Sequence, residues 1–305
     1  MRQFVQQLVN GTVLGATYGL IALGYTMVYG IIQLINFAHG EVFMVGAFGG
    51  LTAYRYWLPE SVIDNTWVAL PAVLLVAMVV SVATAVLMER LAYRPLRNAP
   101  RLAPLITAIG VSIFLQEVVR LFYPGGRRQQ PFPRLISEGT FEVAGVTVAW
   151  VSVFVVVVAV ALMVALQVFV KATKTGKAMR ATSQDPESAK LMGIDIDRVI
   201  VVTFVLGAAL AAVAGVMQGM RFAQIDFRIG FLAGLKAFTA AVLGGIGNIT
   251  GAVLGGFLLG IVEALATQYV PHGSSWKDVW AFIVLIAVLV LRPGGLLGER
   301  VASRA

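Results

Sequence analysis

The chain has 305 residues, of which 59% are hydrophobic and only 12% are charged, and its mean hydropathy is +0.86. Soluble globular domains usually contain about 45 to 50% apolar residues, so this composition excludes a soluble globule and predicts a polytopic membrane protein. The net charge of +8 lies mostly between apolar runs, where Lys and Arg set membrane topology, and does not indicate nucleic-acid binding. The lack of cysteine in the sequence excludes disulfides, thiolate metal sites and a thiol nucleophile.

Two apolar segments, residues 4–32 and 33–57, open the chain. Glycines recur at four-residue spacing in the first and predict close helix packing: Gly11, Gly15 and Gly19. The second begins QLINFAHGEVFMVGAF, in which Asn36, His39 and Glu41 interrupt the apolar run. Polar groups at membrane depth are costly, so they indicate function. This segment either crosses the membrane or is re-entrant, which leaves the side of the N-terminus open.

Three further spans are predicted at residues 66–88, 102–122 and 148–170. The first ends in the basic stretch ERLAYRPLR, which predicts a cytoplasmic loop. Residues 125–146 are polar, rich in turn formers and expected on the outside. The third span leads into residues 171–198, the longest clearly polar interruption of the chain.

Residues 171–198 are predicted to be cytoplasmic because the segment is strongly basic. Its Lys and Arg residues are Lys171, Lys174, Lys177, Arg180, Lys190 and Arg198. Asp185 is the expected N-cap of a short helix, Pro186 its first residue and Gly193 its stop. Isolated helices below about 12 residues are marginal in water, so this one is expected to dock on a partner. The alternative is an ordinary basic loop on lipid headgroups.

The last third predicts a helix at 199–220, two helices within 230–265 separated by a Gly-rich break at 244–251, and a short final span at 279–291. A cytoplasmic tail follows. The chain is therefore expected to be an all-α integral membrane protein, with about eight or nine transmembrane helices including Gly-rich broken segments. Residues 1–305 are expected to form a single transmembrane domain.

Lys236 and Glu263 lie on the two helices that flank the Gly-rich break at 244–251, which is called the late break below. They are about 12 residues before and 14 residues after the turn. They are therefore predicted at similar depth and can form an intramembrane ion pair, which is tolerated where a lone charge is not. The alternative is that Lys236 extends to the outer interface and Glu263 faces a water-filled cavity.

Several long motifs, in order along nearly the whole chain, resemble the bacterial branched-chain amino acid ABC transporter permeases of the LivH type. They are GYTMVYGIIQLINFAHGEVFMVGAF, ERLAYRPLR, LITAIGVSIFLQ, GLKAFTAAVLGGIGNITGAVLGGFLLGI and RPGGLLG. Residues 187–193 also match the ABC-permease coupling signature EAA-x3-G, as Glu187, Ser188, Ala189 and Gly193. Ser188 departs from that signature at its second position, and the downstream I-x-L-P is missing.

The resemblance implies an inner-membrane permease subunit of an ATP-driven importer for branched-chain amino acids. It implies as partners a second homologous permease, two cytoplasmic ATPases and a periplasmic binding protein, within membrane lipid. Residues 171–198 would be the coupling loop, with Ala189 and Met192 docked in an ATPase cleft and Glu187 at its rim. ATP would be bound by the separate ATPase subunits, and the chain itself would hold no cofactor.

A zwitterionic solute with an apolar side chain needs a few polar groups among apolar walls. The polar interruption at residues 36–41, called the early break below, contains Asn36, His39 and Glu41. These residues are predicted to face Thr239 and Asn248 of the late break along the translocation path. The alternative is that Asn36 and His39 cap the broken helix ends.

Other functions were weighed from the residues present. The sequence contains no G-x-x-x-x-G-K-[ST] phosphate loop, and His39 and His272 are its only histidines, so neither nucleotide binding, a metal site nor enzymatic activity is expected. A secondary transporter would use buried ionisable groups such as Glu41, Lys236 and Glu263. Within the family, urea or short amides are alternative solutes. Neighbouring genes for two ATPases and a binding protein would exclude the secondary transporter.

Overall fold

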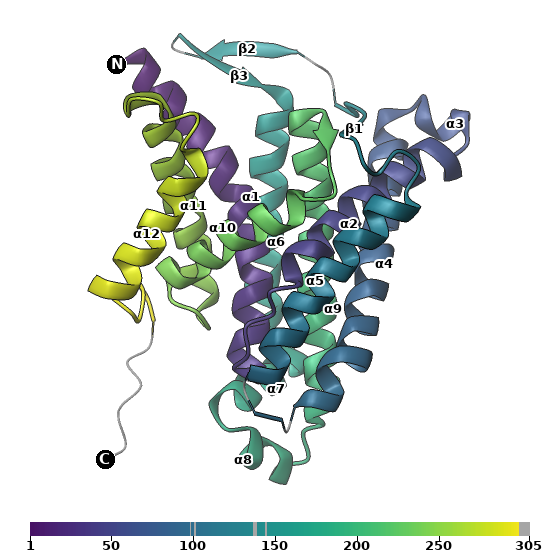
Figure 1. Ribbon diagram of the computed structural model, residues 1–305, viewed down its shortest axis with the longest axis vertical. Coiled ribbons are helices and arrows are strands. Elements are labelled where there is room, and N and C mark those ends of the chain that lie inside the picture. The colour runs from purple at the N-terminus through teal and green to yellow at the C-terminus, as the bar shows by residue number, and fades with distance from the viewer. Residues whose placement is uncertain (98, 101, 137–138, 144, 299–305) are drawn as a thin grey trace.

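The computed structural model describes residues 1–97, 99–100, 102–136, 139–143 and 145–298 (Figure 1). Within these ranges, six helices are long and apolar enough to cross a membrane. They are α1 (Arg2–Ile32), α4 (Thr66–Met88), α5 (Leu102–Phe122), α6 (Trp150–Ala172), α9 (Ile196–Phe222) and α11 (Ile249–Tyr269). Residues 299–305 of the predicted tail lie outside the described part of the chain.

Shorter helices complete the bundle. Apolar sequence also forms α2 (His39–Thr52), which follows the break at 33–38, α10 (Ile229–Gly244), which precedes the break at 245–248, and α12 (Lys277–Leu291), which follows the turn at 270–276. The predicted all-α class with Gly-rich broken segments is confirmed. The remaining helical segments are η1 (Ala53–Trp57), α3 (Glu60–Ile63), η2 (Glu89–Tyr93), η3 (Arg94–Leu96), α7 (Lys174–Gln184) and α8 (Pro186–Leu191).

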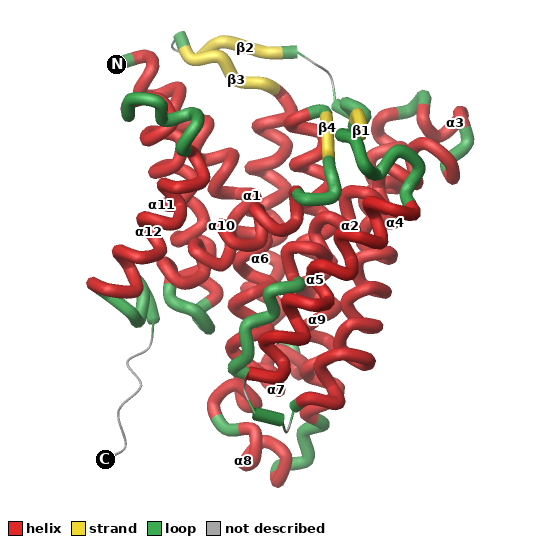
Figure 2. Tube along the Cα trace, viewed as in Figure 1, coloured by secondary structure: helices red, strands yellow, loops and turns green. Residues whose placement is uncertain are grey.

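Two short antiparallel strand pairs lie at one end of the described structure (Figure 2). β1 (Gln130–Pro131) pairs with β4 (Gln224–Ile225), and β2 (Thr140–Val143) forms a hairpin with β3 (Val146–Ala149). The sequence predicted an outside polar loop here and did not predict the hairpin. The hairpin turn contains Gly145, whose φ of +78° lies in the left-handed region that favours glycine.

The helices form a buried centre and an apolar periphery. α1 and α9 are buried along most of their length and contact each other. α1 also contacts α10 and α11, and α9 contacts α2. In contrast, α4, α5 and α6 present large apolar side chains to the outside. A peripheral helix in lipid needs no polar face, so this exposure agrees with a membrane environment. The N-terminus lies at the end of the molecule opposite α7 and α8 (Figure 1).

Glycines allow α1 and α11 to touch through their backbones. A Cβ on Gly15 would lie 2.5 Å from Cα of Phe257, and a Cβ on Gly256 would lie 2.5 Å from Cα of Gly19. Real Cβ atoms do not approach a backbone that closely, so the four-residue glycine spacing does mark a helix contact, as predicted.

Gly256→Ala is expected to destabilise the fold by about 1 to 3 kcal/mol, because the added methyl forces two backbones apart. The measurement is the midpoint temperature for aggregation of the detergent-solubilised protein. Gly110→Ala on α5 is the matched control, since no described atom outside its own helix backbone lies within 4 Å of a Cβ there. Equal midpoints for the two variants would contradict the packing role of Gly256.

Candidate functional site

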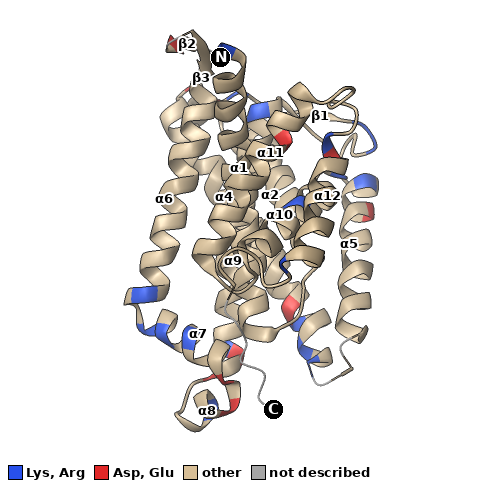
Figure 3. Cartoon of the chain, turned by 90° about the vertical axis from the view of Figure 1, so that its left-hand side faces the viewer, with Lys and Arg blue, Asp and Glu red and all other residues tan. Residues whose placement is uncertain are grey.

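The strongly basic segment folds into two helices at one end of the molecule (Figure 3). α8 begins as predicted: the Asp185 carboxylate accepts hydrogen bonds from the backbone N–H groups of Glu187 (3.0 Å) and Ser188 (3.1 Å). Pro186 is its first residue, and Gly193 follows its end with φ of +82°. This left-handed conformation favours glycine, and the Gly193 N–H donates to the Lys190 carbonyl.

Of the two apolar residues predicted to dock on a partner, the structure buries Ala189 and exposes Met192. Ala189 is 4% exposed and packs inside the chain, so it is not available to a partner. Leu191 and Met192, in contrast, are 88% and 85% exposed. α8 contacts α9, and the burial of Ala189 leaves Met192 as the exposed one of the two predicted docking residues. The pair Leu191 and Met192 forms the exposed apolar tip of the loop.

A second feature that sequence reasoning missed is α7, which precedes α8. Thr173 caps it by accepting a hydrogen bond from the Gly176 N–H at 2.9 Å, and Met179 is buried beneath it. A T-x-x-G sequence with an amphipathic run behind it was the available signal. α7 contacts α6, α1 and α9, so it joins the loop to the membrane helices.

The early break is organised by Asn36. Its side-chain oxygen accepts hydrogen bonds from the Ala38 N–H (3.0 Å) and from the Tyr93 hydroxyl (2.6 Å), and its backbone carbonyl accepts from the His39 N–H. Asn36 therefore closes the turn before α2, as the capping alternative predicted for this residue, whereas His39 is the first residue of α2. It is buried, with an exposed fraction of 2%.

His39 and Glu41 point into the protein interior. The His39 ring meets Tyr25 edge-on at 5.0 Å, in space left by Gly24, where a Cβ would lie 2.5 Å from Cε1 of His39. Glu41 is fully buried and accepts hydrogen bonds from Ser112 (3.0 Å) and Gln116 (2.9 Å) of α5. These two partners were not predicted.

The five predicted path residues lie on segments that pack together in part, since α2 contacts α10 and the Phe37 and Phe238 rings are 5.7 Å apart, and their use as a path stays a prediction. The Thr239 hydroxyl is buried and donates to the Leu235 carbonyl of its own helix. Asn248 caps α11 by accepting from the Gly251 N–H, and its amide donates to the Leu297 carbonyl. The hydrogen bonds of Asn36 and Glu41 lead instead to Tyr93 and to α5.

Lys236 and Glu263 lie together as predicted, with Lys236 Nζ 2.7 Å from Glu263 Oε1. The cluster is larger than a pair, because Asp278 of α12 lies 2.6 Å from the same ammonium and the Tyr18 hydroxyl donates to Glu263 Oε2 at 3.0 Å. Lys236 does not extend to the outer interface. The charged group thus joins α1, α10, α11 and α12.

A second ionic cluster, which the sequence did not predict, lies at the end of the molecule that holds α7 and α8. Arg97 forms ion pairs with the fully buried Glu89 and with Asp197, and Arg94 lies 2.5 Å from the other oxygen of Asp197. These contacts fasten the end of α4 to the first turn of α9. No group of His, Asp or Glu in the described ranges has the arrangement of a metal site.

A helix bundle with an apolar periphery, broken central helices and a basic end (Figure 3) defines a multi-pass membrane protein. The fold is similar to that in PsaBC from Streptococcus pneumoniae in complex with Fab, with a TM-score of 0.52 over 93% of this chain and 91% of that chain at 12% identity. At this identity the likeness shows the fold alone.

Sequence comparison gives the family. Residues 7–289 match the model described as branched-chain amino acid transport system / permease component. The chain is 46% identical to the high-affinity branched-chain amino acid transport system permease protein LivH of Salmonella typhimurium strain LT2, covering 97% of this chain and 96% of that protein. It is equally 46% identical to the corresponding protein BraD of Pseudomonas aeruginosa strain PAO1, with the same coverage. The chain belongs to the permease component family of branched-chain amino acid transport systems, and the LivH-type resemblance is confirmed.

Proposed function

We propose that this chain is the transmembrane permease subunit of an ATP-driven importer for branched-chain amino acids, and that it forms the translocation path with a second homologous permease. The observation that carries the proposal is the 46% identity to LivH and BraD over nearly the full length of both chains. The aligned regions include the two helix breaks, the basic loop and both ionic clusters of this chain.

The proposed partners follow from the same family and from the shape of the basic end. α8 is the coupling helix, and two cytoplasmic ATPases bind there and hold the ATP. A periplasmic binding protein delivers the solute at the opposite end, where the N-terminus lies. The membrane is the bacterial inner membrane, with the basic loop in the cytoplasm. The chain itself acts as a permease and not as an enzyme.

The groups that would serve an ion-coupled transporter are engaged in contacts within the protein. Lys236 is bonded to Glu263 and Asp278, and Glu41 to Ser112 and Gln116. Such groups hold helices together, which favours the ATP-driven function over ion coupling.

The test is uptake of radiolabelled leucine into proteoliposomes that contain the chain with its co-expressed permease, ATPases and binding protein. Uptake is expected to require ATP on the ATPase side and to persist when ion gradients are collapsed. Uptake of urea in place of leucine, or leucine uptake that follows an ion gradient without ATP, would contradict the proposal.

Asn36→Ala is expected to lower stability by about 1 to 3 kcal/mol, because the buried Ala38 N–H and Tyr93 hydroxyl lose their acceptor. Thermal unfolding of the purified complex measures this, and Thr84→Ala on α4, which removes a hydroxyl bonded only within its own helix turn at the described positions, is the control. Leucine uptake per assembled complex is measured in parallel. Unchanged uptake would remove Asn36 from the translocation path.

A further inference from the structure

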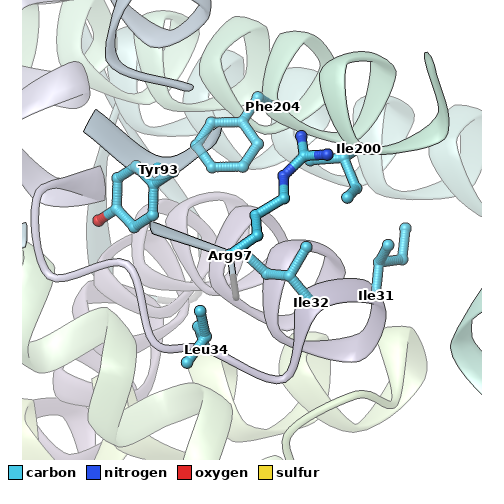
Figure 4. A pocket seen from close by; sticks show the side chains of 7 residues that line it. All are labelled: Ile31, Ile32, Leu34, Tyr93, Arg97, Ile200 and Phe204. Atoms are coloured by element: carbon cyan, nitrogen blue, oxygen red, sulfur yellow. The ribbon is translucent and has the colours of Figure 1, made fainter. Parts of the chain in front are cut away.

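A cavity of about 170 Å³ is lined by seven residues, whose side chains Figure 4 shows. It lies where the end of α1, the segment after α4 and the start of α9 meet. Most of its walls are apolar or aromatic, and one is a guanidinium: Ile31, Ile32, Tyr93, Arg97, Ile200 and Phe204. None of the predicted path residues lines it, but the Tyr93 hydroxyl is bonded to Asn36 of the early break.

Arg97 is the charged residue of the cavity lining, and the carboxylates beside it belong to the ionic cluster that it joins. Arg97 lines the cavity and pairs with Glu89 and Asp197, while Arg94 pairs with Asp197. Two guanidinium groups and two carboxylates leave the cluster without net charge. Such a cluster offers donors to a carboxylate and acceptors to an ammonium, and it does not favour a ligand with net charge of either sign. Arg97 and Asp197 are 22% and 49% exposed in their side chains, so both are accessible.

The apolar side of the cavity matches a short branched hydrocarbon. A protein cavity of roughly 150 Å³ lined by Leu, Ile and Phe admits benzene, so about 170 Å³ accommodates an aliphatic group of four carbons together with the small polar end of an amino acid. Ile31, Ile200 and Phe204 are at most 8% exposed, which makes this part of the wall pre-formed.

We propose that this cavity is an exit-side site that binds one branched-chain amino acid as a zwitterion. The side chain lies among the isoleucines and Phe204, the carboxylate meets Arg97 and the ammonium meets Asp197. The inference rests on the proposed function, because it takes the transported solute as ligand and the α7–α8 end as cytoplasmic. Binding is weak, with a dissociation constant of about 1 mM, since a site that releases solute into the cytoplasm must empty readily.

The absence of cysteine from the sequence allows a direct test. Leu34 also lines the cavity and is half-buried, so Leu34→Cys places the sole thiol of this chain at the cavity wall. The rate of maleimide labelling of this chain is measured in inside-out vesicles that contain the assembled complex. With leucine at about ten times its dissociation constant, the free fraction of sites and hence the labelling rate fall about tenfold.

Control variants and ligands make the test specific. Ser183→Cys on the exposed side of α7 reports reagent access at the same end, and leucine is expected to leave its labelling unchanged. Ile32→Cys is a second reporter in case Leu34→Cys does not assemble. Valine is expected to protect as leucine does. Glycine lacks the side chain, isovalerate lacks the ammonium and isoamylamine lacks the carboxylate, and none of these three is expected to protect.

Protection by isovalerate or isoamylamine equal to that by leucine would overturn the zwitterion site, and so would a leucine effect on Ser183→Cys as large as on the cavity reporters. Leucine uptake by right-side-out vesicles of the same complexes separates the two proposals. Uptake without protection of Leu34→Cys and Ile32→Cys overturns this inference and leaves the proposed function standing. No leucine uptake by the unaltered complex overturns the proposed function, and this inference with it.

Discussion

Lys236→Ala is expected to remove most of the folded protein from the membrane. Lys236 is 6% exposed, and its ammonium neutralises both Glu263 at 2.7 Å and Asp278 at 2.6 Å. Removing one partner of a buried ion pair costs about 3 to 5 kcal/mol, because the remaining charge stays buried without compensation. Proteins are usually stable by only about 5 to 15 kcal/mol, so this is a large share of the total. The measurement is the yield of monodisperse protein after mild detergent extraction, together with its unfolding temperature.

Companion variants test whether the cost comes from the ionic cluster. Glu263→Ala is expected to be milder than Lys236→Ala, because the ammonium keeps Asp278 as a partner. The double variant of Lys236 and Glu263 is expected to fold better than Lys236→Ala alone, since Asp278, 34% exposed in its side chain, can reach water. Lys277→Ala, next to Asp278 but exposed, is the control for loss of a positive charge. Additive losses in the double variant would exclude coupling between the two residues.

The helices were predicted well from the sequence where their bounds depend only on residues within the same segment. The bounds of α4 and α5 agree with the predicted spans at 66–88 and 102–122, because a continuous apolar run and its polar ends decide a span without reference to other segments. The caps of α8 were likewise predicted, since Asp185, Pro186 and Gly193 act on their own backbone. The N-terminus, whose side of the membrane the sequence left open, lies at the end of the molecule opposite α7 and α8 (Figure 1).

Contacts between distant segments were predicted only in part. Lys236 and Glu263 flank one turn, so their depth could be calculated from helix rise, but Asp278 belongs to another helix and Tyr18 lies 218 residues before Lys236. Glu41 with Ser112, and Arg97 with Asp197, are similarly remote in sequence. Hydropathy predicts how deep such a group lies in the membrane, but it does not predict which helices are neighbours in the bundle. The partners of these groups could therefore be identified only from the fold.

The variant Leu191→Ser/Met192→Ser is expected to abolish uptake while leaving the permease folded. Both side chains are more than 80% exposed at the tip of α8, so the protein itself loses little when they are replaced. On the proposed function they are the apolar groups that an ATPase cleft receives. Truncating an interface anchor costs about 2 kcal/mol or more, equivalent to a roughly 30-fold weaker affinity for each residue. Co-purification of the ATPases with the tagged permease measures the loss.

The same co-purification assay distinguishes the contribution of the exposed apolar residues from those of the charge of Lys190 and of the backbone conformation at Gly193. Lys190→Ser changes an exposed residue of α8 without altering the apolar tip, so it is expected to retain the ATPases. Gly193→Val keeps the tip but places a β-branched side chain at φ of +82°, where the strain is about 1 to 2 kcal/mol, and it is expected to weaken ATPase binding by redirecting α8. In each variant the second permease is expected to remain bound, because the changed residues lie outside the membrane-spanning helices. If Leu191→Ser/Met192→Ser instead retains both ATPases and transports leucine normally, α8 is a topological segment of the loop and the ATPases must bind elsewhere.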